Sequence, residues 1–238
     1  MLDSIPSENI LFLDIETVPA FPAFSYLPEA WKKLWEKKSA LKRKEKTAEE
    51  YYPSAGIFAE FGKIICICCG YLTTSRGKRQ FRTKSFAGDD EKQILSGFAD
   101  LLNSHFSKKD HTLCAHNGKE FDFPFIARRM LINGIRLPLI LDLAGKKPWE
   151  VQLLDTMELW KFGDYKSFTS LELLASVFGI KTPKDDIDGS MIWKVYWQNK
   201  DLKRIVTYCR KDVITIAQVF LRFRGEEKME EKEISIAD

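Results

Sequence analysis

The stretch from Ile10 to Pro19, I-L-F-L-D-I-E-T-V-P, places two acids within a short apolar run. Its bulky apolar residues predict a strand that is buried on both faces of a sheet. Because side chains alternate along a strand, Asp14 and Glu16 should point to the same side, about 7 Å apart along the backbone. Two ionised carboxylates about 4 Å apart repel by about 4 kcal/mol at an effective dielectric constant of about 20, and a cation would reverse that sign. The stretch alone is equally compatible with Asp14 capping a turn and Glu16 lying in solvent.

The bulk composition predicts one α/β domain. The chain has 238 residues, 45% of them hydrophobic, which is enough to bury a sizeable core. Its 37 basic and 34 acidic side chains give a net charge of +3, so any affinity for an anion must be local. We expect a single domain over residues 1–224, with a basic helical insertion at about residues 20–60. Residues 225–238 should form an acidic, flexible tail.

The cysteines and the hydropathy pattern indicate a soluble cytoplasmic protein without a membrane partner. Five cysteines lie mostly in apolar runs: Cys66, Cys68, Cys69, Cys114 and Cys209. Cys66 and Cys69 have C-x-x-C spacing, but on a strand they would point to opposite faces, so packing is favoured over a metal site or a disulfide. No early basic-then-apolar signal segment and no run of about 18 apolar residues is found.

Apolar periodicity predicts the remaining elements. Strands are expected at residues 61–72, 79–86, about 112–115 and 151–156, the first two joined as a hairpin. Helices are expected at residues 89–106, from about 124, at 170–178 and at 201–224. Residues 133–147 should be largely irregular, and residues 183–189 should form an acidic turn.

A strongly basic helix is predicted from about Pro28. Its apolar stripe contains Trp31, Leu34, Trp35 and Leu41. Eight cations surround this stripe: Lys32, Lys33, Lys37, Lys38, Lys42, Arg43, Lys44 and Lys46. The segment could contact phosphates beside a site. A solvated face on a helix packed by its two tryptophans explains the pattern slightly better.

The stretch T-L-C-A-H-N-G-K-E-F-D-F-P from residue 112 allows two starts for the helix that follows. Asn117 with Glu120 has the form of a capping box, but this register would bury Pro124 inside the helix. A helix that begins at Pro124 is therefore preferred, with Asp122 just ahead of it and surrounded by aromatic residues. His116 is better explained as a polar loop residue than as a ligand, and Asp155 as a structural acid.

The last predicted helix carries a third acidic position. Tyr208 and Asp212 are four residues apart, so they lie on one helical face, about 6 Å apart along the axis. Ligands of open α/β sheets gather at the carboxyl ends of strands, where Asp14 and Glu16 should lie. If both helices pack there, four carboxylates share one pocket. Oxygen ligands in this number suit Mg²⁺ or Mn²⁺ better than zinc.

Three motifs, F-L-D-I-E-T, N-G-K-E-F-D-F-P and Y-C-R-K-D, resemble those of the DnaQ-like DEDD superfamily of 3′-to-5′ exonucleases in its tyrosine form. Within that superfamily the chain most resembles stand-alone exonucleases that are similar to the proofreading exonuclease domain of family B DNA polymerases. The resemblance implies a ribonuclease H-like α/β fold with a mixed five-stranded sheet and helices on both faces. It implies that two Mg²⁺ or Mn²⁺ ions are bound by Asp14, Glu16, Asp122 and Asp212. By the same resemblance, Tyr208 would orient the attacking water, and Asn117 and Phe121 would contact the terminal nucleotide.

The expected function is therefore a 3′-5′ exonuclease that releases nucleoside 5′-monophosphates from the 3′ end of single-stranded DNA. RNA is the rival substrate, because the tyrosine form also occurs in ribonuclease D-like enzymes. A nucleic-acid-binding module with a silent active site is a different possibility. The presence of all four acids and the tyrosine weighs against it.

Overall fold

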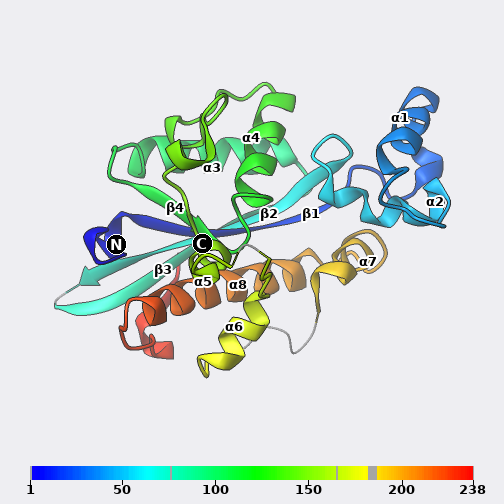
Figure 1. Cartoon of the computed structure of the whole chain (residues 1–238). Coiled ribbons are helices and arrows are strands. Elements are labelled where there is room, and N and C mark those ends of the chain that lie inside the picture. Colours follow the sequence, from blue (N-terminus) through cyan, green and yellow to red (C-terminus); the bar gives the residue numbers. More distant parts are fainter. Residues whose placement is uncertain (1, 76, 165, 182–186, 238) are drawn as a thin grey trace.

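The central element of the fold is β1 (Ile10–Pro19), which lies inside a six-stranded sheet of order β5-β4-β1-β2-β3-β6 (Figure 1). The other strands are β2 (Gly62–Ser75), β3 (Lys78–Ala87), β4 (Thr112–Ala115), β5 (Leu154–Asp155) and β6 (Ile234–Ile236). β1 pairs antiparallel with β2 and parallel with β4, so the sheet is mixed, as predicted. The computed structural model describes residues 2–75, 77–164, 166–181 and 187–237.

Helices cover both faces of the sheet. One face carries α3 (Glu91–His105) and α4 (Asp122–Ile132). The other carries α5 (Thr156–Lys161), α6 (Leu171–Val177), α7 (Ile192–Trp197) and the long α8 (Leu202–Phe223) (Figure 1). Leu11 and Leu13 pack in the core under α3 and α4, whereas Ile10 and Phe12 pack in the core under α8. The alternation therefore directs the next two even-numbered side chains, the acids of β1, toward α8.

The helix boundaries follow local sequence signals. Asp90 caps α3 and Asp201 caps α8 through their carboxylates, and Gly179 follows α6 with a φ of 61°. α4 begins at Asp122, two residues before the predicted start at Pro124. The proline is accommodated because it lies in the first turn, where a missing N–H removes no intrahelical hydrogen bond. Short 3₁₀ helices lie at Leu2–Ser4, Ser7–Asn9, Phe24–Tyr26, Tyr52–Ile57, Leu139–Leu141, Pro148–Glu150, Gly189–Met191 and Glu231–Glu233.

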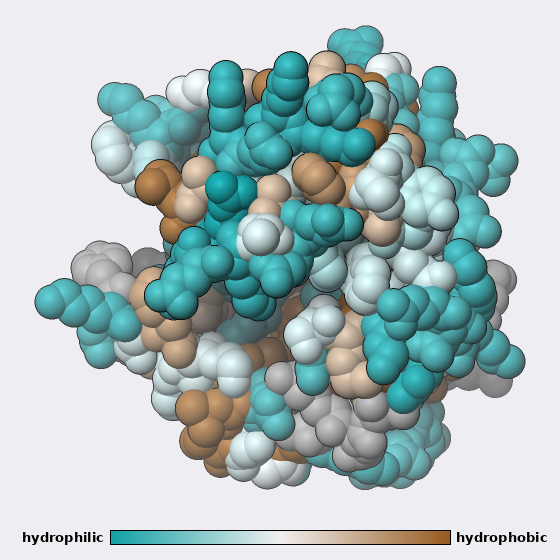
Figure 2. Space-filling view, turned by 90° about the vertical axis from the view of Figure 1, so that its right-hand side faces the viewer, coloured by the Kyte–Doolittle hydropathy of each residue, from teal (hydrophilic) through white to brown (hydrophobic). Residues whose placement is uncertain are grey.

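The basic segment forms α1 (Glu29–Ser39) and α2 (Ala48–Tyr51) beyond the end of β1 (Figure 1). Trp35 is fully buried among Tyr52, Phe58 and Phe61, and its indole N–H donates to the Ala48 carbonyl over 2.8 Å. Trp31 is 42% exposed, but its ring packs edge-on against Phe61 with ring centroids 5.5 Å apart, so both tryptophans pack the segment, Trp35 fully and Trp31 in part. Figure 2 looks onto this end of the molecule and shows hydrophilic side chains over much of it.

The sixth strand comes from the acidic tail, which the sequence analysis left outside the sheet. β6 pairs in parallel with Phe81–Thr83 of β3. Arg79 of β3 donates to the Glu233 carboxylate over 3.1 Å and to the carbonyls of Glu227 and Lys228. This arginine thus ties a charged segment to the sheet. Residues 182–186 of the predicted acidic turn lie outside the described residues.

None of the described helices is both long and apolar enough to cross a membrane.

Candidate active site

The site begins where β1 loses one of its neighbours. Within β1, pairing with β4 involves Ile10–Phe12, so the next residues of β1 extend beyond this neighbour. There Asp122, at the start of α4, accepts a hydrogen bond from the Ile15 backbone N–H over 3.2 Å. This contact holds the Asp122 carboxylate against the residue between Asp14 and Glu16. Glu16 is 7% exposed and Asp122 3%, so a solvent position for Glu16, one of the two alternatives from sequence, is wrong.

α8 completes the site from the other face of the sheet. Cys209 contacts the Asp14 carbonyl through its thiol over 3.4 Å. A carboxylate oxygen from each of Asp14 and Glu16 lies within 4.8 Å of the Cys209 sulfur and of the other. The buried Tyr208 hydrogen-bonds Asp212, and both are close enough to the acids of β1 for their charges to interact. The structure thus brings together the four acids and the tyrosine.

The electrostatics of the site are those of crowded carboxylates. Burial raises the pKa of Asp14 well above its ordinary value, and the charges of Asp122, Glu16 and Asp212 raise it further. Burial, followed by the charges of Asp212 and Asp122, raises the pKa of Glu16 in the same way. The pKa of Asp122 rises to about 7, mainly through burial, although the Ile15 N–H opposes this shift. Asp14, Glu16 and Asp122 therefore hold their protons more tightly than free carboxyl groups do until a positive charge enters the site.

The donor set fits hard divalent cations. The Asp14 Oδ2 atom is buried and has no hydrogen-bond partner among the described residues. A buried carboxylate oxygen without a donor is costly, and coordination by a cation would satisfy it. Carboxylate oxygens are ligands for Mg²⁺ or Mn²⁺. Asp14, Glu16, Asp122 and Asp212 are therefore the residues that could hold such ions.

The loop that leads into Asp122 is fixed by Asp155. Its carboxylate accepts from the backbone N–H groups of Asn117 over 2.9 Å and Lys119 over 3.1 Å, and it caps α5. The structural role predicted for Asp155 is confirmed. Asn117 has a φ of 61°, so the capping box suggested at this position does not form. His116 is likewise held by protein, with Nδ1 2.9 Å from the Thr156 hydroxyl.

The two predicted nucleotide-contacting residues lie in this same segment. Asn117 is half-buried at the bend of the loop. Phe121 is half-buried directly before α4, with its ring centroid 5.3 Å from that of Phe125. Both side chains therefore retain exposed surface close in sequence to Asp122.

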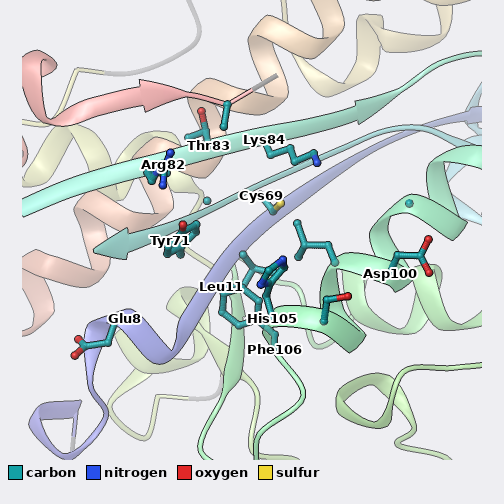
Figure 3. Close-up of a pocket in the computed structure, with 15 residues that line it drawn as sticks. Glu8, Leu11, Cys69, Tyr71, Arg82, Thr83, Lys84, Asp100, His105 and Phe106 are labelled. Atoms are coloured by element: carbon teal, nitrogen blue, oxygen red, sulfur yellow. The ribbon is translucent and has the colours of Figure 1, made fainter. Parts of the chain in front are cut away.

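A pocket of about 630 Å³ lies elsewhere and contains none of these residues. Figure 3 shows Tyr71, Arg82, Lys84, His105 and Phe106 around it, together with Leu11 near the start of β1. The candidate site is a cluster of acids along the edge and face of β1, not this pocket.

Sequence reasoning missed the sulfur atoms beside the acids. Asp14 lies opposite Cys68, and Glu16 opposite Cys66, in the β1–β2 register. The two cysteines therefore share the face of the sheet that carries the acids. The spacing of Cys66 and Cys68, two residues apart on a predicted strand, indicates that they share a face. Their contact with Cys209 depends on the packing of α8 and has no local sequence signal.

Comparison with known proteins agrees with this geometry. Residues 57–235 match the family described as predicted 3′-5′ exonucleases related to the exonuclease domain of PolB. The matched region includes Asp122, Tyr208 and Asp212, and it begins after Asp14 and Glu16. No curated protein matches the chain.

The fold resembles that of the family B DNA polymerase from the hyperthermophilic archaeon Pyrobaculum calidifontis, with a TM-score of 0.50 and 15% sequence identity. The match covers 90% of this chain but only 24% of the polymerase, and at this identity it supports the fold alone. The ribonuclease H-like α/β fold expected from the three motifs is confirmed, with six strands in place of five. The chain belongs to the family of predicted 3′-5′ exonucleases related to the exonuclease domain of PolB.

Proposed function

We propose that the protein is a two-metal-ion-dependent 3′-5′ exonuclease that removes nucleoside 5′-monophosphates from the 3′ end of single-stranded DNA. One observation carries the proposal: the Asp122 carboxylate accepts a hydrogen bond from the N–H of Ile15, the residue between Asp14 and Glu16 in the sequence. The interaction of Asp212 and Tyr208, both on α8, with the acids of β1 supports the same proposal.

The acids would serve as ligands. Asp14, Glu16, Asp122 and Asp212 would hold two Mg²⁺ or Mn²⁺ ions. When bound, such ions lower the pKa of water and stabilise the charge on a leaving oxygen. Before binding, the unpartnered Asp14 Oδ2 and the mutual repulsion of the carboxylates leave the site short of positive charge.

Tyr208 would orient the attacking water through its hydroxyl. Burial and the charges of Asp212, Glu16 and Asp14 raise the pKa of this phenol above its ordinary value. It therefore keeps its proton at neutral pH and is a poor general base. Its hydrogen bond to Asp212 fixes the direction of the hydroxyl.

Asn117 and Phe121 would contact the terminal nucleotide. The Phe121 ring is braced by Phe125 and offers an aromatic face to a base, a contact that tolerates any sequence. Asn117 is held by the hydrogen bond from its backbone N–H to Asp155. A single strand suits this arrangement, because its terminal base is free to leave the stack.

The test uses purified protein with 3′-labelled and 5′-labelled single-stranded DNA and RNA, each with Mg²⁺ or Mn²⁺. We expect mononucleotides to be released from the 3′ end of DNA. Release of mononucleotides from RNA alone would make RNA the substrate and leave the proposed reaction unchanged. Binding without cleavage by the wild type would contradict the nuclease assignment. Asp14→Asn is the matched control, because it preserves the shape of the side chain and removes its charge.

A further inference from the structure

Three cysteines meet beside the acidic cluster. Cys66 and Cys68 are two residues apart on β2, so both side chains point toward α8. Cys209 lies on α8 and belongs to the same core cluster. The three sulfur atoms all lie within 4.8 Å of one another, and those of Cys66 and Cys68 are 3.5 Å apart. All three side chains are fully buried, and none is in a disulfide. We call these residues the thiol cluster.

The thiol cluster and the acids occupy neighbouring strands in register. Cys68 lies opposite Asp14 and Cys66 opposite Glu16. Cys209 belongs to both groups, because its sulfur is also within 4.8 Å of a carboxylate oxygen of Asp14 and of Glu16. The carboxylates of β1 and the two sulfurs of β2 thus lie on neighbouring strands, and Cys209 of α8 contacts both groups.

The spacing of the sulfurs matches a metal site. A Zn–S bond of about 2.3 Å places the sulfurs of a tetrahedral site about 3.8 Å apart. The sulfurs of Cys66 and Cys68 are 3.5 Å apart and no pair of the three is more than 4.8 Å apart, so small rotations of the side chains are sufficient. Thiolates select soft cations, whereas Mg²⁺ prefers carboxylates, so the two neighbouring groups differ in the ions they attract.

We propose that Cys66, Cys68 and Cys209 bind one thiophilic divalent cation of the Zn²⁺ and Cd²⁺ class, separately from the hard cations of the acidic cluster. On binding, three S–H protons leave to solvent and three sulfur–metal bonds form. The proposal stands on the sulfur positions and does not depend on the nuclease assignment.

Two polar side chains border the thiol cluster, and one of them is positively charged. The Cys68 sulfur is 3.3 Å from the hydroxyl of the half-buried Ser85. Arg210 donates to the same hydroxyl over 3.0 Å. Three thiolates with one divalent cation carry a net charge of −1, which the Arg210 guanidinium complements.

The experiment titrates the reduced, metal-free full chain with Cd²⁺ in excess Mg²⁺. We expect thiolate-to-cadmium charge-transfer absorption in the ultraviolet that saturates at about one equivalent, with release of about three protons. Cys66→Ser and Cys68→Ser should each abolish saturation at one equivalent. Cys69→Ser is the matched control: this neighbouring buried cysteine packs in the core on the opposite face, and its loss should change nothing.

Two results would overturn the proposal: no sulfur absorption in the wild type, or equal Cd²⁺ binding by wild type and Cys68→Ser. If the serine variants unfold, X-ray absorption of the zinc-loaded wild type decides, because the site requires three sulfur neighbours at about 2.3 Å. Oxygen and nitrogen neighbours alone would refute it. A chain that binds Cd²⁺ in this way but cleaves no nucleic acid retains the thiol site and loses only the proposed function.

Discussion

Two buried carboxylate sites lie on the same sheet and are satisfied in opposite ways. Glu91, at the start of α3, is 8% exposed and accepts hydrogen bonds from Arg129 Nε over 2.8 Å, from the Ile64 N–H over 2.7 Å and from Asn133 over 2.9 Å. Arg129 is itself held by the Ala59 carbonyl. The protein provides the counter-charge here, and the pair joins α3 to α4.

Asp14 is surrounded instead by carboxylates. Its neighbours in the electrostatic sense are Glu16, Asp122 and Asp212, and its Oδ2 atom has no partner in the part of the chain that the structure describes. Burial alone does not distinguish the two sites. The sign of the surrounding charge does: Glu91 is paired with a cation of the protein itself, whereas Asp14 lies among acids that could hold cations from solution.

The largest effect should come from Asp14→Asn. We expect nuclease activity to fall by about 100- to 1000-fold, because one ligand of the cationic site is lost. In metal-free buffer the variant should be at least as stable as the wild type, since one of four repelling charges is gone. Nuclease assays and urea denaturation measure the two effects. If this variant kept wild-type nuclease activity, the assignment of Asp14 to the catalytic site would be wrong.

The reverse outcome is expected for Glu91→Gln. Removing this charge leaves Arg129 buried without its partner, which should lower the free energy of unfolding by about 3 to 5 kcal/mol. Activity per folded molecule should stay close to that of the wild type, because the Glu91 carboxylate contacts Ile64, Arg129 and Asn133 and none of the clustered acids. Urea denaturation and assays at low temperature provide the check. If Glu91→Gln lost activity but kept its stability, Glu91 would not be a structural carboxylate, and the difference drawn between the two sites would be wrong.

A smaller effect is expected for Tyr208→Phe. The ring and its packing remain, and only the hydroxyl that hydrogen-bonds Asp212 is removed. Activity should fall by about 10- to 100-fold, as is typical when a residue that positions a reacting group is lost. Metal-dependent stabilisation should remain, because no ligand is lost, and thermal unfolding with and without Mg²⁺ measures this. Loss of that stabilisation would contradict a purely orienting role.

The smallest effect concerns pH in metal-free protein. The pKa of Asp122 is about 7 in the folded chain against an ordinary value of 3.8, so between these values the folded state binds more protons than the unfolded state. Its contribution to stability is therefore fully present below about pH 4 and is lost as the pH rises toward about 7. Urea denaturation at about pH 5 and about pH 7.5 in EDTA should show the decline. Adding Mg²⁺, or replacing the residue as Asp122→Asn, should make this decline in stability smaller.

Local patterns in the sequence were sufficient for much of the site. Alternation along β1 put Asp14 and Glu16 on one face, and helical spacing put Tyr208 beside Asp212. The position of Asp122 could not be derived in this way. It depends on β4 ending early enough for a side chain to bond Ile15, which is a property of the assembled sheet.

Long-range packing also explains what the sequence did not reveal elsewhere. Trp31 and Trp35 belong to one predicted stripe, but the aromatic residues that bury Trp35 come from a later segment of the chain. The acidic composition of the tail favoured a frayed end. Its pairing depends on Arg79 and on an edge of β3 that no local pattern indicates.

The docking of β6 has a practical consequence for shortened forms of the protein. A variant that ended after α8 would keep the acidic cluster around β1. It would uncover the N–H and C=O groups of Phe81–Thr83 that β6 now satisfies. Bare sheet edges recruit strands from other molecules. Such a variant would tend to self-associate, so a fusion partner or affinity tag is better attached beyond β6 than in its place.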